Sequence, residues 1–163
     1  MQLTSRDTKI IEWITDNRGA TISQINKLFF TNYTTCSIRL KKLADNKFLK
    51  VAVHPVLGKK VYYVKKLPSF HALVLNEFII KHKDNIRLVQ REYKIKNFIV
   101  DCIIILKTEK LLVIEIDIYN RTKKDKINSI KDILNKAKVE YEFWIVSKRE
   151  VREKIKGVEY RIL

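Results

Sequence analysis

Three carboxylates interrupt the most apolar stretches of the sequence. Asp101 lies in the run Phe98–Leu106, and Glu115 and Asp117 lie in the run Leu111–Ile118. Burying an unpaired charge costs free energy, so an acidic residue in an apolar strand needs a compensating partner. Because only a short turn separates the two runs, pairing across it can place Asp101 beside Glu115. Two adjacent carboxylates repel unless a cation lies between them, and such oxygen ligands suit Mg²⁺ or Mn²⁺.

A fourth carboxylate, Glu77, lies in the stretch Ser69–His82, whose apolar pattern predicts a helix. Glu115 and Asp117 have the same parity along their strand, so both project from one face of the sheet. If the site is active, the candidate catalytic residues are Glu77, Asp101, Glu115 and Asp117. Asp101 and Glu115 would then be the metal ligands, with Mg²⁺ or Mn²⁺ as the cofactor.

This arrangement resembles the PD-(D/E)XK nuclease superfamily, which has an acid on one central strand, an acid-x-lysine on the next and a glutamate on the preceding helix. Asp101 matches the first acid, Glu115 the second and Glu77 the helix glutamate. Asp117 stands where the family has the lysine that positions or activates the attacking water. A replacement lysine from the following helix would have to reach back over more than one turn; the candidates are Lys123, Lys124 and Lys126. The resemblance therefore implies a nuclease-like domain that does not cleave, in a protein that binds DNA without a cofactor.

A purely structural role for the carboxylates is the alternative, because each could pair with a basic residue such as Arg91, Lys94 or Arg121. No other catalytic pattern is present in the sequence. It lacks a glycine-rich phosphate loop, a CxxC pair and histidines spaced as paired metal ligands. The two cysteines fit no disulfide or ligand spacing, which favours a reducing compartment.

The elements that would carry a binding function lie in the amino-terminal third. Helix-capping patterns begin at Thr4 and Thr21, and a third helix is expected after Thr31–Tyr33. Two strand-like runs, Phe48–Val53 and Lys59–Val64, then flank a hairpin loop. Three helices followed by a hairpin resemble the winged helix-turn-helix family over residues 4–66. Residues 1–66 hold 13 Lys+Arg against 4 Asp+Glu, which makes this the more basic part per residue.

In winged helices the third helix enters the major groove, and the hairpin meets phosphates or the minor groove. Arg39 is the only long bidentate donor of the third helix, so we expect base recognition to depend on it. The alternatives are a solvated basic face and a winged helix used for protein contacts. The resemblance implies the DNA-binding residues Thr34, Thr35, Ser37, Ile38, Arg39, Lys41 and Lys42 on the helix, and Lys59 and Lys60 on the hairpin.

The pattern of apolar residues after residue 66 predicts a domain built around a β-sheet. The two apolar runs indicate central strands buried on both faces. A charged helix is expected at about Thr122–Lys138, then a strand at Tyr141–Val146, a short helix near Lys148–Lys156 and a last strand at Val158–Leu163. We expect an α+β protein with a winged helix-turn-helix domain at 1–66. A restriction-endonuclease-like α/β domain with a mixed sheet is expected at 67–163.

The net charge of the whole sequence indicates which class of partner the protein binds. Lys+Arg outnumber Asp+Glu by 34 to 18, a net charge of +16, which indicates a polyanionic partner and nucleic acid before membrane. No apolar run approaches the ~18 residues that a membrane span needs. The first residues lack the apolar segment of a signal peptide. We therefore expect a cytoplasmic bacterial protein with no membrane partner.

A second resemblance covers most of the chain. The start Leu3–Asp7, the winged helix, and Glu115-Ile116-Asp117 followed by Arg121-Thr122 resemble the replication-relaxation family of plasmids and conjugative elements. It implies a double-stranded DNA-binding accessory protein that binds a specific site during DNA replication, relaxation or conjugative transfer. A relaxase or replication initiator would be its partner, and a homodimer is expected. The alternatives are a metal-dependent DNA endonuclease targeted by the winged helix and a transcriptional repressor.

Overall fold

The computed structural model describes residues 1–162, and the chain divides into two compact units, Met1–Lys81 and His82 onward. The α+β class predicted from the sequence is the one observed, with a mixed five-stranded sheet in the second unit. The division between the units falls one helix later than the predicted 66/67. No helix among the described residues has both the length and the apolar content to cross a bilayer.

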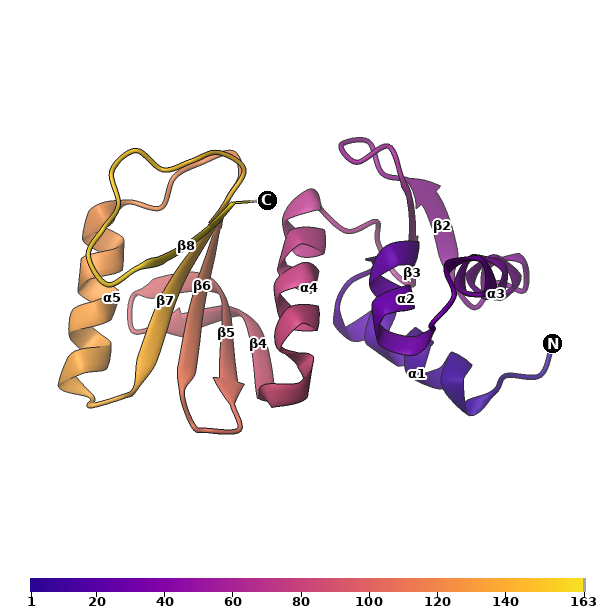
Figure 1. The fold of residues 1–163 in the computed structure, drawn as a ribbon, viewed down its shortest axis with the longest axis horizontal. Coiled ribbons are helices and arrows are strands. Elements are labelled where there is room, and N and C mark those ends of the chain that lie inside the picture. Colours follow the sequence, from indigo (N-terminus) through magenta and orange to yellow (C-terminus); the bar gives the residue numbers. More distant parts are fainter. Residues whose placement is uncertain (163) are drawn as a thin grey trace. The chain divides into compact units, whose positions relative to one another are not determined.

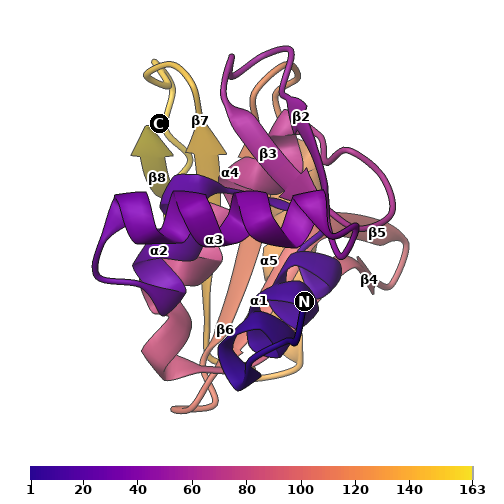
Figure 2. The same ribbon diagram turned by 90° about the vertical axis from the view of Figure 1, so that its right-hand side faces the viewer.

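The first unit combines three helices with a small antiparallel sheet (Figure 1). Its sheet has the strand order β1-β3-β2, so β3 is central and β2 is an edge. Figure 2 shows α3 from the side, with the β2–β3 hairpin beside it. The elements are α1 (Ser5–Asp16), β1 (Ala20–Thr21), α2 (Ile22–Phe29), α3 (Tyr33–Asp45), β2 (Lys50–Val53) and β3 (Lys60–Tyr63).

Side-chain caps begin all three of these helices. Thr4 and Asp7 form a reciprocal capping box at α1, as Thr21 and Gln24 do at α2. The Asn32 side chain accepts from the Thr35 amide at α3. Such caps satisfy backbone donors that the first turn leaves without partners. The helices then bury a shared core that includes Ile10, Ile14, Ile25, Leu40 and Leu43.

The helix α4 (Phe70–His82) is bonded to the first unit, which explains the position of the division. Asn76 is fully buried, and its Nδ2 donates to the carbonyl oxygens of Asn17 (3.2 Å) and Gly19 (2.7 Å). Gln24 Nε2 donates to the Leu73 carbonyl at 2.7 Å. Buried donors are rarely left without an acceptor, so these bonds fix α4 to β1 and α2.

The second unit is a five-stranded sheet of order β4-β5-β6-β7-β8. The pairs β4–β5 and β5–β6 are antiparallel, and β6–β7 and β7–β8 are parallel. The helix α5 follows β6 and lies along one face of the sheet (Figure 1). The elements are η1 (Lys83–Asn85), β4 (Ile86–Ile95), β5 (Phe98–Leu106), β6 (Leu111–Asp117), α5 (Lys124–Lys136), β7 (Tyr141–Ser147) and β8 (Glu159–Ile162).

The prediction that the two apolar runs are buried on both faces is confirmed. Val113 packs on the α5 side with Ile127 and Ile130, and Leu112 and Ile114, of opposite parity, are also buried. Both cysteines, Cys36 and Cys102, are free thiols in the described chain and are buried.

The predicted short helix near Lys148–Lys156 is wrong. The segment connects β7 to β8 as bends and turns. Only Val151 and Ile155 offer apolar contacts there, which is too little to offset the cost of nucleating a helix of two turns. The Ile155 amide instead donates to the Tyr160 hydroxyl at 2.9 Å.

Candidate functional site

The outer face of α3 is the first candidate site. The helix turns Cys36, Leu40 and Leu43 into the core, and this spacing leaves the opposite face to solvent. Of the predicted DNA-binding residues, most lie on that exposed face, whereas Ser37 is half-buried. The exposed set is Thr34, Thr35, Ile38, Lys41 and Lys42.

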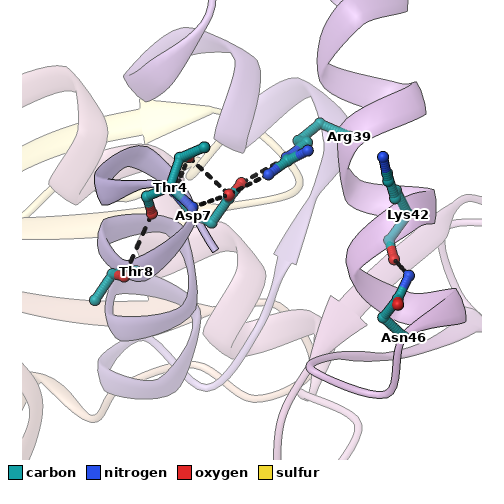
Figure 3. Close-up of polar contacts among 6 residues, drawn as sticks. All are labelled: Thr4, Asp7, Thr8, Arg39, Lys42 and Asn46. Atoms are coloured by element: carbon teal, nitrogen blue, oxygen red, sulfur yellow. Dashed lines mark hydrogen bonds and ion pairs between the residues drawn. The ribbon is translucent and has the colours of Figure 1, made fainter. Parts of the chain in front are cut away.

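Arg39 does not lie on that face, and the expectation that it recognises bases is not supported by its position. Its side chain reaches back to α1, where Nε donates to Asp7 Oδ1 at 2.7 Å and Nη2 bonds to Asp7 Oδ2 (Figure 3). Asp7 is 1% exposed and also accepts from the Thr4 hydroxyl at 2.6 Å. A buried carboxylate binds a guanidinium strongly, so Arg39 has a structural role in joining α3 to α1.

The electrostatics of this pair follow from its contacts. The hydrogen bond from Arg39 holds the pKa of Asp7 far below its usual range, although burial acts in the opposite direction. The same bond raises the pKa of Arg39. Both groups are therefore charged at neutral pH, and the pair is an internal brace between α1 and α3.

The β2–β3 hairpin presents Lys59 and Lys60 to solvent, as predicted. Its loop is held by His54, whose Nδ1 accepts from the amides of Val56 (3.2 Å) and Leu57 (3.3 Å). Because Nδ1 accepts, the proton is assigned to Nε2, which lies 3.2 Å from the Pro68 carbonyl oxygen. His54 is thus a buried structural residue that fixes the hairpin.

The second candidate site is the acidic pair of the sheet. Cys102 is paired with Ile114 across β5 and β6, so Asp101 and Glu115 each lie next to this pair, and the charge of Asp101 acts on Glu115. Asp101 Oδ2 accepts from the Ile116 amide at 2.7 Å. The structure therefore brings together the two predicted metal ligands, on the face that α5 covers.

A lysine that was expected to be out of reach completes this group. Lys126, on the first turn of α5, places Nζ 2.5 Å from Glu115 Oε1. This contact is an ion pair with a largely buried carboxylate, and it lowers the pKa of Glu115. The expectation that no lysine reaches back is corrected, because the chain between β6 and α5 returns the helix over the sheet.

Burial dominates the protonation of Glu115, which is 4% exposed. Burial raises the pKa of Glu115 to about 7, Lys126 opposes the rise, and the negative charge of Asp101 adds to it. A carboxyl with a pKa near neutrality beside a second acid and a lysine is a common feature of functional sites. Structural ion-pair networks produce the same perturbation.

The other two predicted acids have different partners. Asp117 accepts from the Thr122 amide (2.9 Å) and from the Thr122 hydroxyl (2.6 Å), so it organises the loop after β6. Glu77 forms an ion pair of 2.7 Å with Lys27 within the first unit. Among residues 1–162, no group of three or more His, Cys, Asp and Glu side chains gathers as a metal site.

A pocket of about 620 Å³ opens where β6 and β7 end. Its lining includes the exposed Tyr119 and two acids, Asp117 and Glu153. Basic residues outnumber the acids, so the pocket suits an anion. The basic lining residues are Arg121, Lys124, Lys148, Arg149 and Lys154.

Comparison with known proteins identifies no family for this chain. No protein-family model matches it, and no curated protein sequence matches it; neither supports membership of the replication-relaxation family. One similar solved structure is the "crystal structure of a repair endonuclease from Pyrococcus abyssi", with a TM-score of 0.40 and 16% identity. The similarity covers 65% of this chain and 52% of the endonuclease chain, so the chain spans about half the length of that protein. The residues of the two units are therefore the basis for assigning a function.

Proposed function

We propose that the protein binds double-stranded DNA through its first unit, used as a winged helix. In this proposal α3 enters the major groove and the β2–β3 hairpin contacts the backbone. The observation that carries the proposal is that the exposed lysines of α3 and of the hairpin coincide with the two elements that touch DNA in such modules. These lysines are Lys41, Lys42, Lys59 and Lys60.

The test is a binding titration of duplex DNA over a series of salt concentrations. Changing Lys59→Ala together with Lys60→Ala should weaken binding to all sequences alike, because phosphate contacts carry no base information. The salt slope should fall by up to about 2, which corresponds to two lost phosphate contacts.

The matched control changes Lys136→Ala with Lys138→Ala, two exposed lysines at the end of α5. It removes the same charge from the second unit and should leave the slope nearly unchanged. Equal effects of the two double variants would mean that only net charge matters, and would contradict binding by the winged helix.

A second candidate function, a Mg²⁺- or Mn²⁺-dependent DNA nuclease, is favoured by Lys126. With Asp101 and Glu115 it supplies two acids and a lysine, the residue types that the PD-(D/E)XK resemblance requires. The two carboxylates suit a divalent ion, because they are oxygen ligands close enough for the charge of Asp101 to raise the pKa of Glu115. A bound ion would offset charge on a phosphate, while Lys126 would hold a water or a phosphate oxygen nearby.

Plasmid nicking separates the two candidates. Supercoiled plasmid is incubated with Mg²⁺ or Mn²⁺ and the protein, beside Asp101→Ala with Glu115→Ala and beside Lys126→Met. Nicking that all of these substitutions remove would establish the nuclease. Its absence from the wild-type protein, with DNA binding retained, would leave the acidic pair with a structural role.

The biological setting that we propose is the one the sequence resemblance implies. The protein would bind a defined site of a plasmid or mobile element as an accessory to replication, relaxation or conjugative transfer, as a homodimer and with a relaxase or replication initiator. Footprinting on an origin fragment tests the site, and protection of a promoter instead would favour a transcriptional repressor. Light scattering of the full chain tests the dimer.

A further inference from the structure

We infer that α3 recognises thymine through its 5-methyl group, with Ile38 as the main specificity-determining residue. The inference rests on the proposed duplex DNA binding by the first unit and adds the class of site that is bound. The inference follows from which side chains of α3 are exposed to solvent and from the one long polar side chain, Arg39, that points into the first unit instead.

Arg39 is the side chain of α3 that points away from the exposed face. Arginine is the commonest reader of guanine, because its two donors match O6 and N7. Arg39 is the only arginine of α3 (Tyr33–Asp45), and its Nε and Nη2 are both bonded to the buried Asp7. The first half of α3 therefore offers the major groove no bidentate partner for guanine.

The residues that remain carry methyl groups. Thr34, Thr35 and Ile38 lie outward on the first two turns of α3, the part of a recognition helix that faces base edges. The Thr35 hydroxyl donates to Asn32 Oδ1 at 3.3 Å, in the helix cap. Thymine is the base whose major-groove edge presents a methyl group, and apolar side chains contact it there.

Ile38 is the clearest member of this set. It is 64% exposed, whereas the other large apolar residues in the interior of α3, Leu40 and Leu43, are fully buried. Ile38 lies one turn after Thr34 and one turn before Lys41 or Lys42, so these side chains share a face. The apolar side chain at the centre of this face could pack against the methyl group of a base. The two lysines that follow it could contact the phosphate backbone beside that base.

The test uses the full chain and removes only the methyl group from the DNA. A preferred duplex is selected from a random pool, and each thymine is then replaced in turn by deoxyuridine. At one or more positions the wild-type affinity should fall about fourfold, the value expected for one buried methyl group. Ile38→Ala should bind the thymine and deoxyuridine duplexes with nearly equal affinity at that position.

The matched control is Ile99→Ala, which truncates an exposed isoleucine of the second unit and should keep the wild-type preference for thymine. Duplex binding that never distinguishes thymine from deoxyuridine would overturn this inference and leave the proposed function standing. Absence of duplex binding would overturn both. If Ile38→Ala keeps the thymine preference but changes the oligomeric state, Ile38 is a protein contact and the inference is wrong.

Discussion

At the scale of single residues, Asp7 takes part both in the cap of its own helix, α1, and in an ion pair with α3. Its side chain accepts from Thr4 within the α1 cap and from Arg39 on α3. The cap could be predicted, because its residues are three positions apart. The ion pair joins residues 32 positions apart, and nothing in the local pattern distinguishes Arg39 from its exposed neighbours.

The Asp7–Arg39 pair predicts a clear effect on stability. Asp7→Asn should lower the free energy of unfolding by about 3 kcal/mol, because it leaves a partly buried guanidinium without its charge partner. The wild-type pKa of Asp7 is depressed in the folded state. The stabilisation is therefore present above the unfolded pKa and is lost as the pH falls below about 4.

Urea unfolding at pH 7 and at pH 3 measures both effects. Asp16→Asn is the matched control, since Asp16 is an exposed aspartate of the same helix; it should change stability by less than about 0.5 kcal/mol. An Asp7→Asn protein as stable as the Asp16→Asn protein at pH 7 would contradict the structural role of the pair.

Glu115 predicts the opposite dependence on pH. Its pKa rises on folding, to about 7, so its contribution to stability is fully present below the unfolded pKa and is lost as the pH rises through 7. Between pH 5 and pH 8 the wild-type protein should lose about 2 kcal/mol that Glu115→Gln does not lose. Lys126→Met should extend the loss to higher pH, because Lys126 lowers the pKa of Glu115. Unfolding curves that are parallel for wild type and Glu115→Gln would contradict this account.

At the scale of elements, most of the observed structure has a local cause that the sequence shows. Capping patterns located α1 and α2, and the apolar runs located β5 and β6. Features that depend on tertiary contacts could not be predicted in this way. Lys126 reaches Glu115 only because of the course of the chain after β6. The helix α4 belongs to the first unit because of its hydrogen bonds with Asn17, Gly19 and Gln24.

The helix α4 gives the prediction at this scale. Asn76→Ala should destabilise the first unit by about 2–3 kcal/mol, because the carbonyl oxygens of Asn17 and Gly19 lose their buried donor. Lys81→Ala, an exposed change on the same helix, is the control. A fragment of residues 1–82 should give the dispersed amide spectrum of a folded unit, whereas a fragment of residues 1–66 should not. Folded 1–66 would show that α4 is dispensable to this unit.

At the scale of the whole molecule, the excess of basic residues is present in both units. Residues 1–81 hold 14 Lys+Arg against 5 Asp+Glu, and the remaining residues hold 20 against 13. The pocket at the ends of β6 and β7 gathers five of these basic residues. Each unit therefore has a net positive charge of its own and can attract a polyanion.

This distribution predicts a second contribution to DNA affinity. Arg121→Ala with Lys124→Ala, two exposed residues of the pocket lining, should lower the salt slope of the full chain by up to about 2. The thymine preference should be unchanged, because the inferred methyl contact lies on α3. A slope equal to that of the Lys136→Ala, Lys138→Ala control would show that the pocket makes no contact with DNA.

The brace between α1 and α3 has a consequence for how this protein could evolve. Asp7 keeps Arg39 away from the outer face of α3, so a substitution on α1 would free the Arg39 guanidinium and, in the proposed DNA complex, allow it to contact guanine. Such a change would exchange stability for a new base preference in one step. Lineages that carry a neutral residue at position 7 are therefore expected to combine compensating stabilising substitutions in the first unit with target sites richer in guanine.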